Sequence, residues 1–378
     1  MTFFQNFDFL YAGFAALTWQ QAVMWAIGGV LIYLAIAKEM EPTLLLPLGF
    51  GTIMVNLPAS GAINQMVEGV LEHGPLSTLF NAGIANELFP LILFIGIGAM
   101  IDFGPVLSNP KLMLFGAAAQ FGIFFTMCTA SMFFDINDAA AIGIIGAADG
   151  PTAIVVAQKL GSKYLPAIMV AAYSYMALVP IIQPPVIKLL TTKKERLIRM
   201  PYRPGNVSKA TRILFPIVIT LVAGMVAPAS VALVGFLMFG NLIRECGVLD
   251  SLSDTAQKVL ANLVTIFLGI TIASQMEATA FLQWQTLLIL GLGLFAFIFD
   301  TAGGVLFAKF LNLFLKEKIN PMIGAAGISA FPMSGRVVHK LGLEEDPQNF
   351  LLMQSIGVNV SGQIASVIAG GLILTLFK

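Results

Sequence analysis

Long apolar stretches separated by short polar segments run along nearly the whole chain. The clearest candidates for membrane-spanning helices are residues 22–37, 88–101, 112–134 and 164–190. Trp19 and Trp25 flank the first of them, as aromatic residues do at a membrane interface. At about 20 residues per span, roughly ten or eleven membrane segments fit. We therefore expect an all-α integral membrane protein with a transporter-like fold.

Three segments depart from this simple pattern. Residues 1–18 are mildly amphipathic and aromatic, which suits a lead-in at the membrane interface. Residues 43–57 are apolar but short and contain Pro47 and two glycines, so they predict a broken or re-entrant helix. Residues 59–86 are polar enough for a surface loop or an amphipathic helix.

Residues 142–160, IGIIGAADGPTAIVVAQKL, are apolar but carry an aspartate, Asp149, directly before Gly150 and Pro151. Proline lacks a backbone donor and glycine tolerates almost any backbone angle, so a helix is expected to break here. An ionised carboxylate in such a segment is costly and is therefore a functional-site hypothesis.

The pattern returns in residues 323–341, IGAAGISAFPMSGRVVHKL, which match 142–160 without a gap at seven of nineteen positions. Pro332 repeats Pro151, and Ala330 stands opposite Asp149. Two broken apolar segments in corresponding places point to a transporter site near the bilayer midplane. We expect a first repeat over residues 1–191, a basic cytoplasmic linker over 192–212 and a second, inverted repeat over 213–378.

Composition supports a membrane protein and excludes several other classes. Of the 378 residues 58% are hydrophobic and 11% are charged, well below the about 25% of soluble domains. Lysines plus arginines balance aspartates plus glutamates at 20 each, so nothing favours nucleic acid as a partner. The sequence contains no phosphate-binding loop, no dinucleotide fingerprint and no nucleophile elbow.

Oxygen-bearing side chains near the two breaks predict a Na⁺ site. The candidate ligands are Asp149, Asn320, Ser329 and Asn359. The carboxylate would supply the compensating charge, and neutral oxygens would complete the coordination. Alternatives remain open at this stage: Ser329 could bond to its own helical turn, and Asn359 could join two helices. Asp300 and Glu277 could lie near an interface.

Two long motifs carry a family resemblance. GAADGPT at 146–152 and NPMIGAAGISAFPMSGR at 320–336 resemble the β subunit of the biotin-dependent, sodium-pumping decarboxylases. That family includes the oxaloacetate, methylmalonyl-CoA, glutaconyl-CoA and malonate decarboxylases. The similarity covers essentially the whole chain, and its length is closer to that of the acyl-CoA members.

The resemblance implies that the chain decarboxylates carboxybiotin and couples this reaction to Na⁺ export across the bacterial cytoplasmic membrane. The biotin would arrive on a biotin carrier protein, beside a carboxyltransferase α subunit and a small membrane γ or δ subunit, in an assembly that contains several copies of this chain. The family's essential residues fall on Asp149, Asn320, Gly324, Ser329 and Arg336. Its tyrosine best matches Tyr175, with Tyr173 as a rival.

Carried over in this way, Asp149, Tyr175 and Arg336 are the catalytic candidates. Arg336, Ser329 and Gly324 would contact carboxybiotin. Arg336 could hold the incoming carboxylate, and Tyr175 could conduct a proton.

Two other functions compete with this one. A stand-alone secondary carrier, such as a Na⁺/H⁺ antiporter, would explain an aspartate in a helix break but not the detailed motifs. A non-catalytic membrane anchor for a soluble complex would leave that aspartate unexplained.

Overall fold

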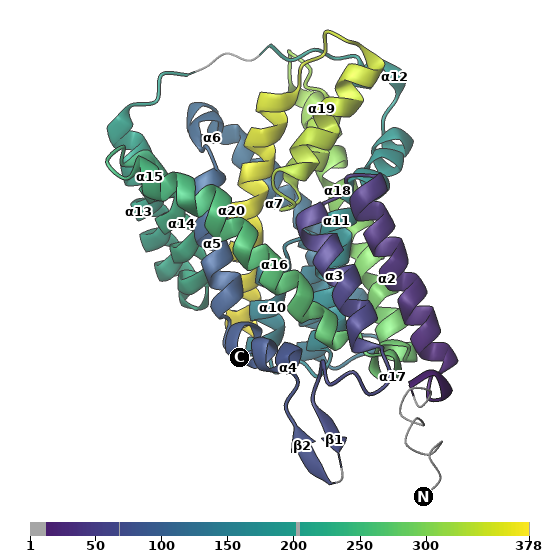
Figure 1. Cartoon of the computed structure of the whole chain (residues 1–378). Coiled ribbons are helices and arrows are strands. Elements are labelled where there is room, and N and C mark those ends of the chain that lie inside the picture. The colour runs from purple at the N-terminus through teal and green to yellow at the C-terminus, as the bar shows by residue number, and fades with distance from the viewer. Residues whose placement is uncertain (1–12, 68, 202–204, 378) are drawn as a thin grey trace, which may run out of the picture. The chain divides into compact units, whose positions relative to one another are not determined.

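The computed structural model describes residues 13–67, 69–201 and 205–377. Most of the predicted interfacial lead-in, and Arg203 of the basic linker, lie outside the described residues. The described chain is almost entirely helical, as predicted (Figure 1). The exception lies in 59–86, where a two-stranded antiparallel hairpin, β1 (Gln65–Val67) and β2 (Val70–Glu72), pairs Met66 with Leu71. The expectation of a loop or an amphipathic helix for this segment was therefore incomplete.

Among the described residues, seven helical stretches are long and apolar enough to cross a membrane, or eight with a pair bent by 62°. The seven are α2 (Trp19–Ala37), Pro110–Ala130, α11 (Leu165–Leu190), α13 (Lys209–Val226), Asp250–Gln275, α18 (Trp284–Phe314) and α20 (Leu352–Leu376). The bent pair joins Pro75–Ile84 to α5 (Leu88–Met100). The predicted ten or eleven segments exceed this count because that prediction also included shorter, broken segments.

The chain divides into two compact units, and the smaller comprises Met1–Phe89 and Asn262–Leu288. Its helices are α2, α3 (Pro42–Val55), α4 (Pro75–Leu79), η2 (Phe80–Ile84), most of α16 (Ala261–Ile272), η7 (Ala273–Gln275) and α17 (Ala278–Phe281). α2 packs on α3 through Gly28 and Gly49, where a Cβ on either glycine would lie 2.7 Å from the other's carbonyl oxygen. Asn56, after α3, bonds to the backbone of Met276 and Ala278 at 2.8 and 2.7 Å.

The predicted break in residues 43–57 is wrong. α3 runs continuously from Pro42 to Val55, with Pro47 inside it. Pro47 lies in the second turn of α3, close to Gly269, where a Cβ would be 2.9 Å from its ring. Tight helix packing therefore keeps this short helix intact despite the missing backbone donor.

The larger unit comprises Pro90–Ala261 and Ile289–Lys378. Its first elements are most of α5, then α6 (Gly104–Ser108), η3 (Pro110–Leu112), α7 (Met113–Ala119), α8 (Phe121–Ala130), α9 (Ile136–Gly143), η4 (Ile144–Ala147), α10 (Gly150–Lys159) and α11. Then follow α12 (Lys193–Arg196), α13, η5 (Pro228–Ser230), α14 (Val231–Glu245), α15 (Asp250–Asp254) and η6 (Thr255–Leu260). The unit is completed by most of α18 and by the whole of η8 (Pro321–Gly327), α19 (Met333–Glu345) and α20.

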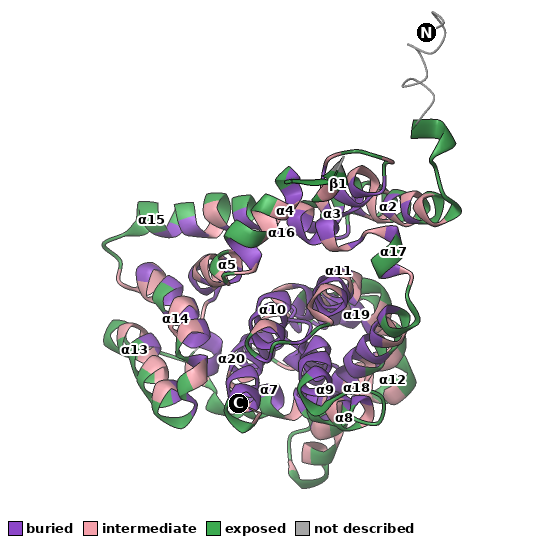
Figure 2. Ribbon diagram, turned by 90° about the horizontal axis from the view of Figure 1, so that it is seen from below, coloured by how far each residue is buried: buried purple, intermediate pink, exposed green. Residues whose placement is uncertain are grey.

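One predicted span in this unit contains a turn. Pro110–Ala130, within which α7 and α8 meet at a turn at Gln120, is still one candidate membrane span. α10, α11 and α20 are largely buried, whereas α13 exposes much of its surface (Figure 2). The larger unit therefore has an interior rich in backbone breaks, which is where ion-binding oxygens can be freed.

Two features recur in both halves of the sequence. A π-helical stretch precedes α5 and another precedes α16, as η2 and η6. The interrupted segment before α11 likewise has a counterpart, η8 with α19, before α20. The boundaries of the two repeats, at residues 191 and 213, stay a prediction.

Candidate functional site

Two re-entrant hairpins form the centre of the larger unit. The first hairpin consists of α9, η4 and α10, and its two ends meet where the Ser162 hydroxyl donates to Asp138 at 2.7 Å. The second hairpin consists of η8 and α19. Its ends meet because Asn320 and Asn349 donate to the same carbonyl oxygen, that of Arg196, at 2.8 and 2.9 Å.

The hairpins enter from opposite ends of α11. The first hairpin leads directly into the start of α11, and the second closes beside Arg196, which bonds to Thr191 just after its end. α11 has 26 residues and is therefore about 39 Å long. The tips meet between these ends, where the Ser329 N–H donates to the Ala147 carbonyl at 2.9 Å.

Local sequence explains the turn at the tip of the first hairpin. Ala148 adopts a left-handed conformation with φ of 51°, which is uncommon outside glycine. Asp149 then caps α10, and Pro151 follows within its first turn. Aspartate is a preferred N-cap and proline is tolerated in the first turn, so these two residues start a new helix where the preceding one stops.

The Asp149 carboxylate is buried and is surrounded by neutral donors. Its Oδ2 accepts hydrogen bonds from the Thr152 hydroxyl at 2.7 Å, and from Gln363 Nε2 and the Ser366 hydroxyl of α20 at 2.9 Å each. The side chain is 3% exposed, and no lysine, arginine or histidine in the described part of the chain pairs with it. A buried charge without a counter-charge is costly, so this arrangement suits a site that takes up a cation.

Ser329 and Asn359 lie beside this cluster. The Ser329 hydroxyl donates to the Gly362 carbonyl of α20 at 3.0 Å and not to its own turn. Asn359 Nδ2 donates to the Ile328 carbonyl at 2.7 Å, so the amide does join α20 to the second hairpin. Its buried Oδ1 has no hydrogen-bond partner among the described residues, which leaves one oxygen for a ligand.

The two candidate tyrosines occupy different places. Tyr173 packs on Gly150, next to Asp149, where a Cβ would lie 2.4 Å from its ring. The Tyr175 hydroxyl instead donates to the Leu290 carbonyl of α18. Tyr173, the rival, is therefore the tyrosine that contacts the break at Asp149.

Comparison with known proteins identifies the family. The sequence model described as "Na+-transporting oxaloacetate decarboxylase beta subunit" matches residues 20–377. The chain is 49% identical to methylmalonyl-CoA decarboxylase subunit beta of Propionigenium modestum, over 98% of each chain. It is 46% identical to the oxaloacetate decarboxylase beta chain of Klebsiella pneumoniae, over 94% of each. It is also 48% identical to glutaconyl-CoA decarboxylase subunit beta of Acidaminococcus fermentans, over 97% of this chain and 95% of that one.

The chain belongs to this family of decarboxylase β subunits. It is a multi-pass membrane protein, as its seven or eight apolar helices and these relatives agree. The predicted family, enzyme class and helical membrane fold are thereby confirmed.

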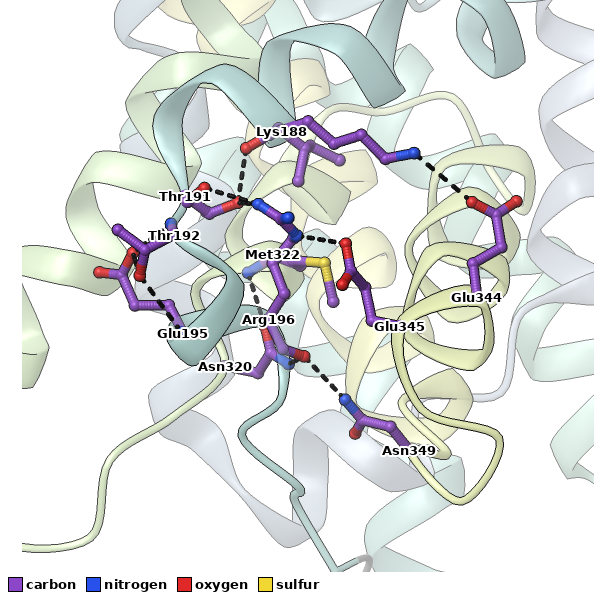
Figure 3. Close-up of polar contacts among 11 residues, drawn as sticks. Lys188, Thr191, Thr192, Glu195, Arg196, Asn320, Met322, Glu344, Glu345 and Asn349 are labelled. Carbon is purple, nitrogen blue, oxygen red and sulfur yellow. Dashed lines mark hydrogen bonds and ion pairs between the residues drawn. The ribbon is translucent and has the colours of Figure 1, made fainter.

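Asn320 of this β subunit lies away from Asp149, at the base of the second hairpin. Its Nδ2 donates to the carbonyls of Arg196 and Ile198 at 2.8 and 2.9 Å. Its Oδ1 accepts from the Met322 N–H at 3.1 Å; Asn320, Arg196 and Met322 are labelled in Figure 3. The seven residues of η8 separate it from the tip by about 14 Å. The structure thus brings Asp149, Ser329 and Asn359 together but not Asn320.

Side chains of the linker hold the same base, in a set of contacts that we name the clasp; Figure 3 shows those of Arg196. Arg196 Nε pairs with Glu345 at 2.6 Å, while its Nη1 donates to the Thr191 carbonyl at 2.6 Å. Arg199 pairs with Asp346 at 2.6 Å, and Glu195 pairs with Lys309 at 3.2 Å. The basic linker is therefore more than a topology signal, because it joins α11, α18 and the second hairpin.

Two acids of the clasp, Asp346 and Glu195, have lowered pKa values. The Arg199 guanidinium and the Gln348 N–H hold the pKa of Asp346 below its usual range. Partial burial acts to raise the pKa of Glu195, but hydrogen bonds from Thr192 and the Lys309 ammonium outweigh it, and the net pKa is lowered. Both acids therefore carry full charge at neutral pH.

Gly324 and Arg336 have contrasting surroundings. Gly324 is buried in η8, where a Cβ would lie 2.0 Å from the Gly304 carbonyl of α18. It permits two backbones to cross, which explains a glycine at this position without any contact to a ligand. Arg336 is exposed in the first turn of α19, and its side chain makes no hydrogen bond or ion pair with any described residue.

Sequence reasoning missed three partners of Asp149, namely Thr152, Gln363 and Ser366. The available signal was a pair of polar residues three positions apart in the apolar segment that forms α20.

The contact between α20 and the first hairpin has a counterpart at the second hairpin. Gln183 of α11 donates to the Ala325 carbonyl and to Ser334 of the second hairpin at 2.6 and 2.7 Å. Each hairpin is thus held by the long helix that follows the other.

The hydrogen bonds between Asn320 and the linker predict the effect of Asn320→Ala. The variant loses three hydrogen bonds, each contributing about 1 kcal/mol. The Ile198 carbonyl loses its side-chain donor, and the Arg196 carbonyl keeps only that of Asn349. We expect trypsin to cleave at Lys193 and Lys194 about tenfold faster than in the wild type. Exposed Asn86→Ala serves as the control. Unchanged cleavage together with weakened Na⁺ binding would instead favour a direct Na⁺ contact.

Proposed function

We propose that this β subunit decarboxylates carboxybiotin presented by a biotin carrier protein and couples the reaction to Na⁺ export. The observation that supports this most directly is the buried Asp149 carboxylate, which lacks a cationic partner among the described residues and lies where two oppositely entering hairpins meet. A site between broken helices is typical of alternating access.

In this proposal Na⁺ is the cargo that neutralises Asp149. The hydroxyl oxygens of Thr152 and Ser366 already lie within 2.9 Å of the carboxylate and can turn their lone pairs to an ion. Gln363 can present its carbonyl oxygen by rotating the amide. With the charge neutralised, the loaded site could move through a low-dielectric barrier at much lower cost.

Decarboxylation would be favoured by a closed, dry site. The N-carboxylate of carboxybiotin gains a proton and then separates into neutral biotin and CO₂, so a medium that penalises the anion promotes its loss. Arg336, exposed and unpaired, is the candidate to receive the carboxylate. Tyr173 and Tyr175 remain the candidates for moving the proton.

The decisive experiment uses proteoliposomes that contain the purified complex and no ion gradient. We expect added carboxybiotin, supplied on the carrier protein, to drive Na⁺ uptake together with CO₂ release. Na⁺ movement that requires an opposing proton gradient, with no response to carboxybiotin, would favour the antiporter alternative.

The proposed ion shell predicts a graded effect of two substitutions. Ser366→Ala and Thr152→Val each remove one oxygen near the ion but keep the carboxylate. We expect each to raise the Na⁺ concentration for half-maximal rate by about tenfold, since one hydrogen bond to a charged group contributes about 1.5–3 kcal/mol. The maximal rate at saturating Na⁺ should change far less.

A matched control lies on the same helix. Ser355 of α20 is fully buried, and its hydroxyl has no partner among the described residues, so Ser355→Ala removes a comparable group outside the shell. The three variants should be compared at equal protein amounts. If Ser366→Ala and Ser355→Ala shared one Na⁺ dependence, Ser366 would have no part in the site.

A further inference from the structure

Asp300 is a second buried acid, on α18, and the proposed mechanism does not use it. It is 1% exposed. Its Oδ1 accepts a hydrogen bond from the Ile123 N–H at 3.2 Å. Ile123 lies in the first turn of α8, just after the turn at Gln120, so the positive end of that helix faces the carboxylate.

The second oxygen of Asp300 has nothing to bind. Oδ2 has no hydrogen-bond partner among the described residues, and no cationic side chain there pairs with it. It faces Gly146, where a Cβ would lie 2.8 Å away. Gly146 lies in η4, three residues before Asp149. Asp300 therefore contacts the side of the short helix that leads into the turn before Asp149.

Another oxygen on this face of α8 also lacks a partner. Thr126 Oγ1 is buried and unpaired within the described chain, and it lies one turn beyond Gly122 on the same face of α8. Asp300 Oδ2 and Thr126 Oγ1 are thus two buried oxygens without a hydrogen-bond partner among the described residues.

Buried oxygens that lack partners are costly, whereas a hard cation with oxygen ligands would satisfy both of them together. We propose that Asp300 Oδ2 is the charged ligand of a second Na⁺ position, with Thr126 supplying a neutral oxygen. The Ile123 N–H at the start of α8 holds the other carboxylate oxygen in place. The choice of Na⁺ among monovalent cations rests on the proposed function. The position is separate from the Asp149 cluster, whose ligands come from α10 and α20.

The test is direct measurement of ²²Na⁺ bound to the purified complex in detergent. We expect Asp300→Asn to bind one Na⁺ fewer per chain than the wild type. Asn keeps the Oδ1 acceptor for the start of α8, so the variant should elute from size exclusion like the wild type. Exposed Asp254→Asn, which makes the same chemical change on an acid paired with Lys258, should bind the wild-type amount.

A second variant and a spectroscopic readout keep the outcome clear. Thr126→Val should weaken the same site several-fold without changing the number of ions at saturation. Wild-type stoichiometry in Asp300→Asn would overturn the proposal. So would an infrared band of a protonated carboxylic acid at saturating Na⁺ that disappears in Asp300→Asn, because a protonated Asp300 cannot be the charged ligand. Loss of a site in Asp300→Asn but not in Asp149→Asn would support this inference and overturn the proposed Asp149 site.

Discussion

Asp149→Asn is expected to abolish Na⁺-coupled decarboxylation while the protein stays folded. The amide keeps the size of the side chain and can still accept from Thr152, but the charge that compensates Na⁺ is gone. Removing one partner of a buried ion pair costs about 3–5 kcal/mol, which corresponds to at least about a hundredfold loss of Na⁺ affinity. Na⁺-dependent CO₂ release from carboxybiotin, in reconstituted vesicles, is the measurement.

Folding and charge can be separated in this experiment. Asp254→Asn makes the same chemical change on an exposed acid and should leave the rate unchanged. Retained elution volume and retained protease resistance of Asp149→Asn would show that packing is intact. A well-folded Asp149→Asn protein with normal stimulation by Na⁺ would contradict the assignment of Asp149 to the ion site.

Part of this site could be predicted because its signals are local. Asp149, Gly150 and Pro151 stand next to one another, so a helix break with a charge beside it is visible in the sequence. The repeat of the pattern around Pro332 is equally visible. Both signals, a charged residue in an apolar segment and a proline that cannot continue a helix, can be recognised from residues adjacent in the sequence.

The partners of Asp149 could not be predicted in this way. Gln363 is 214 positions away along the chain and Ser366 is 217, and only the folded structure brings α20 against the first hairpin. The crosswise arrangement, in which each hairpin is held by the helix after the other, has no local signature. Pattern reasoning favoured Asn320 because it opens the second motif, and the structure places it at the base because the hairpin starts there.

One error in the fold and one turn that was not predicted have the same origin. α3 stays helical through Pro47 because packing against neighbouring helices offsets one missing hydrogen bond. The span Pro110–Ala130 turns at Gln120, although that residue is an adequate helix former, because the start of α8 is turned toward Asp300. Propensity therefore failed at both positions, where contacts between distant segments decide the outcome.

Arg336→Lys is the prediction that best separates a decarboxylase from a plain carrier. Arg336 lies in the first turn of α19, where a positive charge opposes the helix dipole, so helix stability does not explain its presence. It is exposed and unpaired among the described residues, so fold stability does not explain it either. A guanidinium binds a planar carboxylate through two parallel hydrogen bonds, which an ammonium cannot reproduce.

We expect Arg336→Lys to lower kcat/KM for carboxybiotin by at least about tenfold, the equivalent of about 1.4 kcal/mol. Na⁺ binding, measured separately as Na⁺-dependent protection against heat or protease, should be unchanged because the ion cluster does not include Arg336. Lys340→Arg is the matched control, since Lys340 is exposed one turn further along α19. An arginine that merely reaches toward the membrane surface would be replaced well by lysine. A fully active Arg336→Lys enzyme would therefore remove this residue from the substrate site.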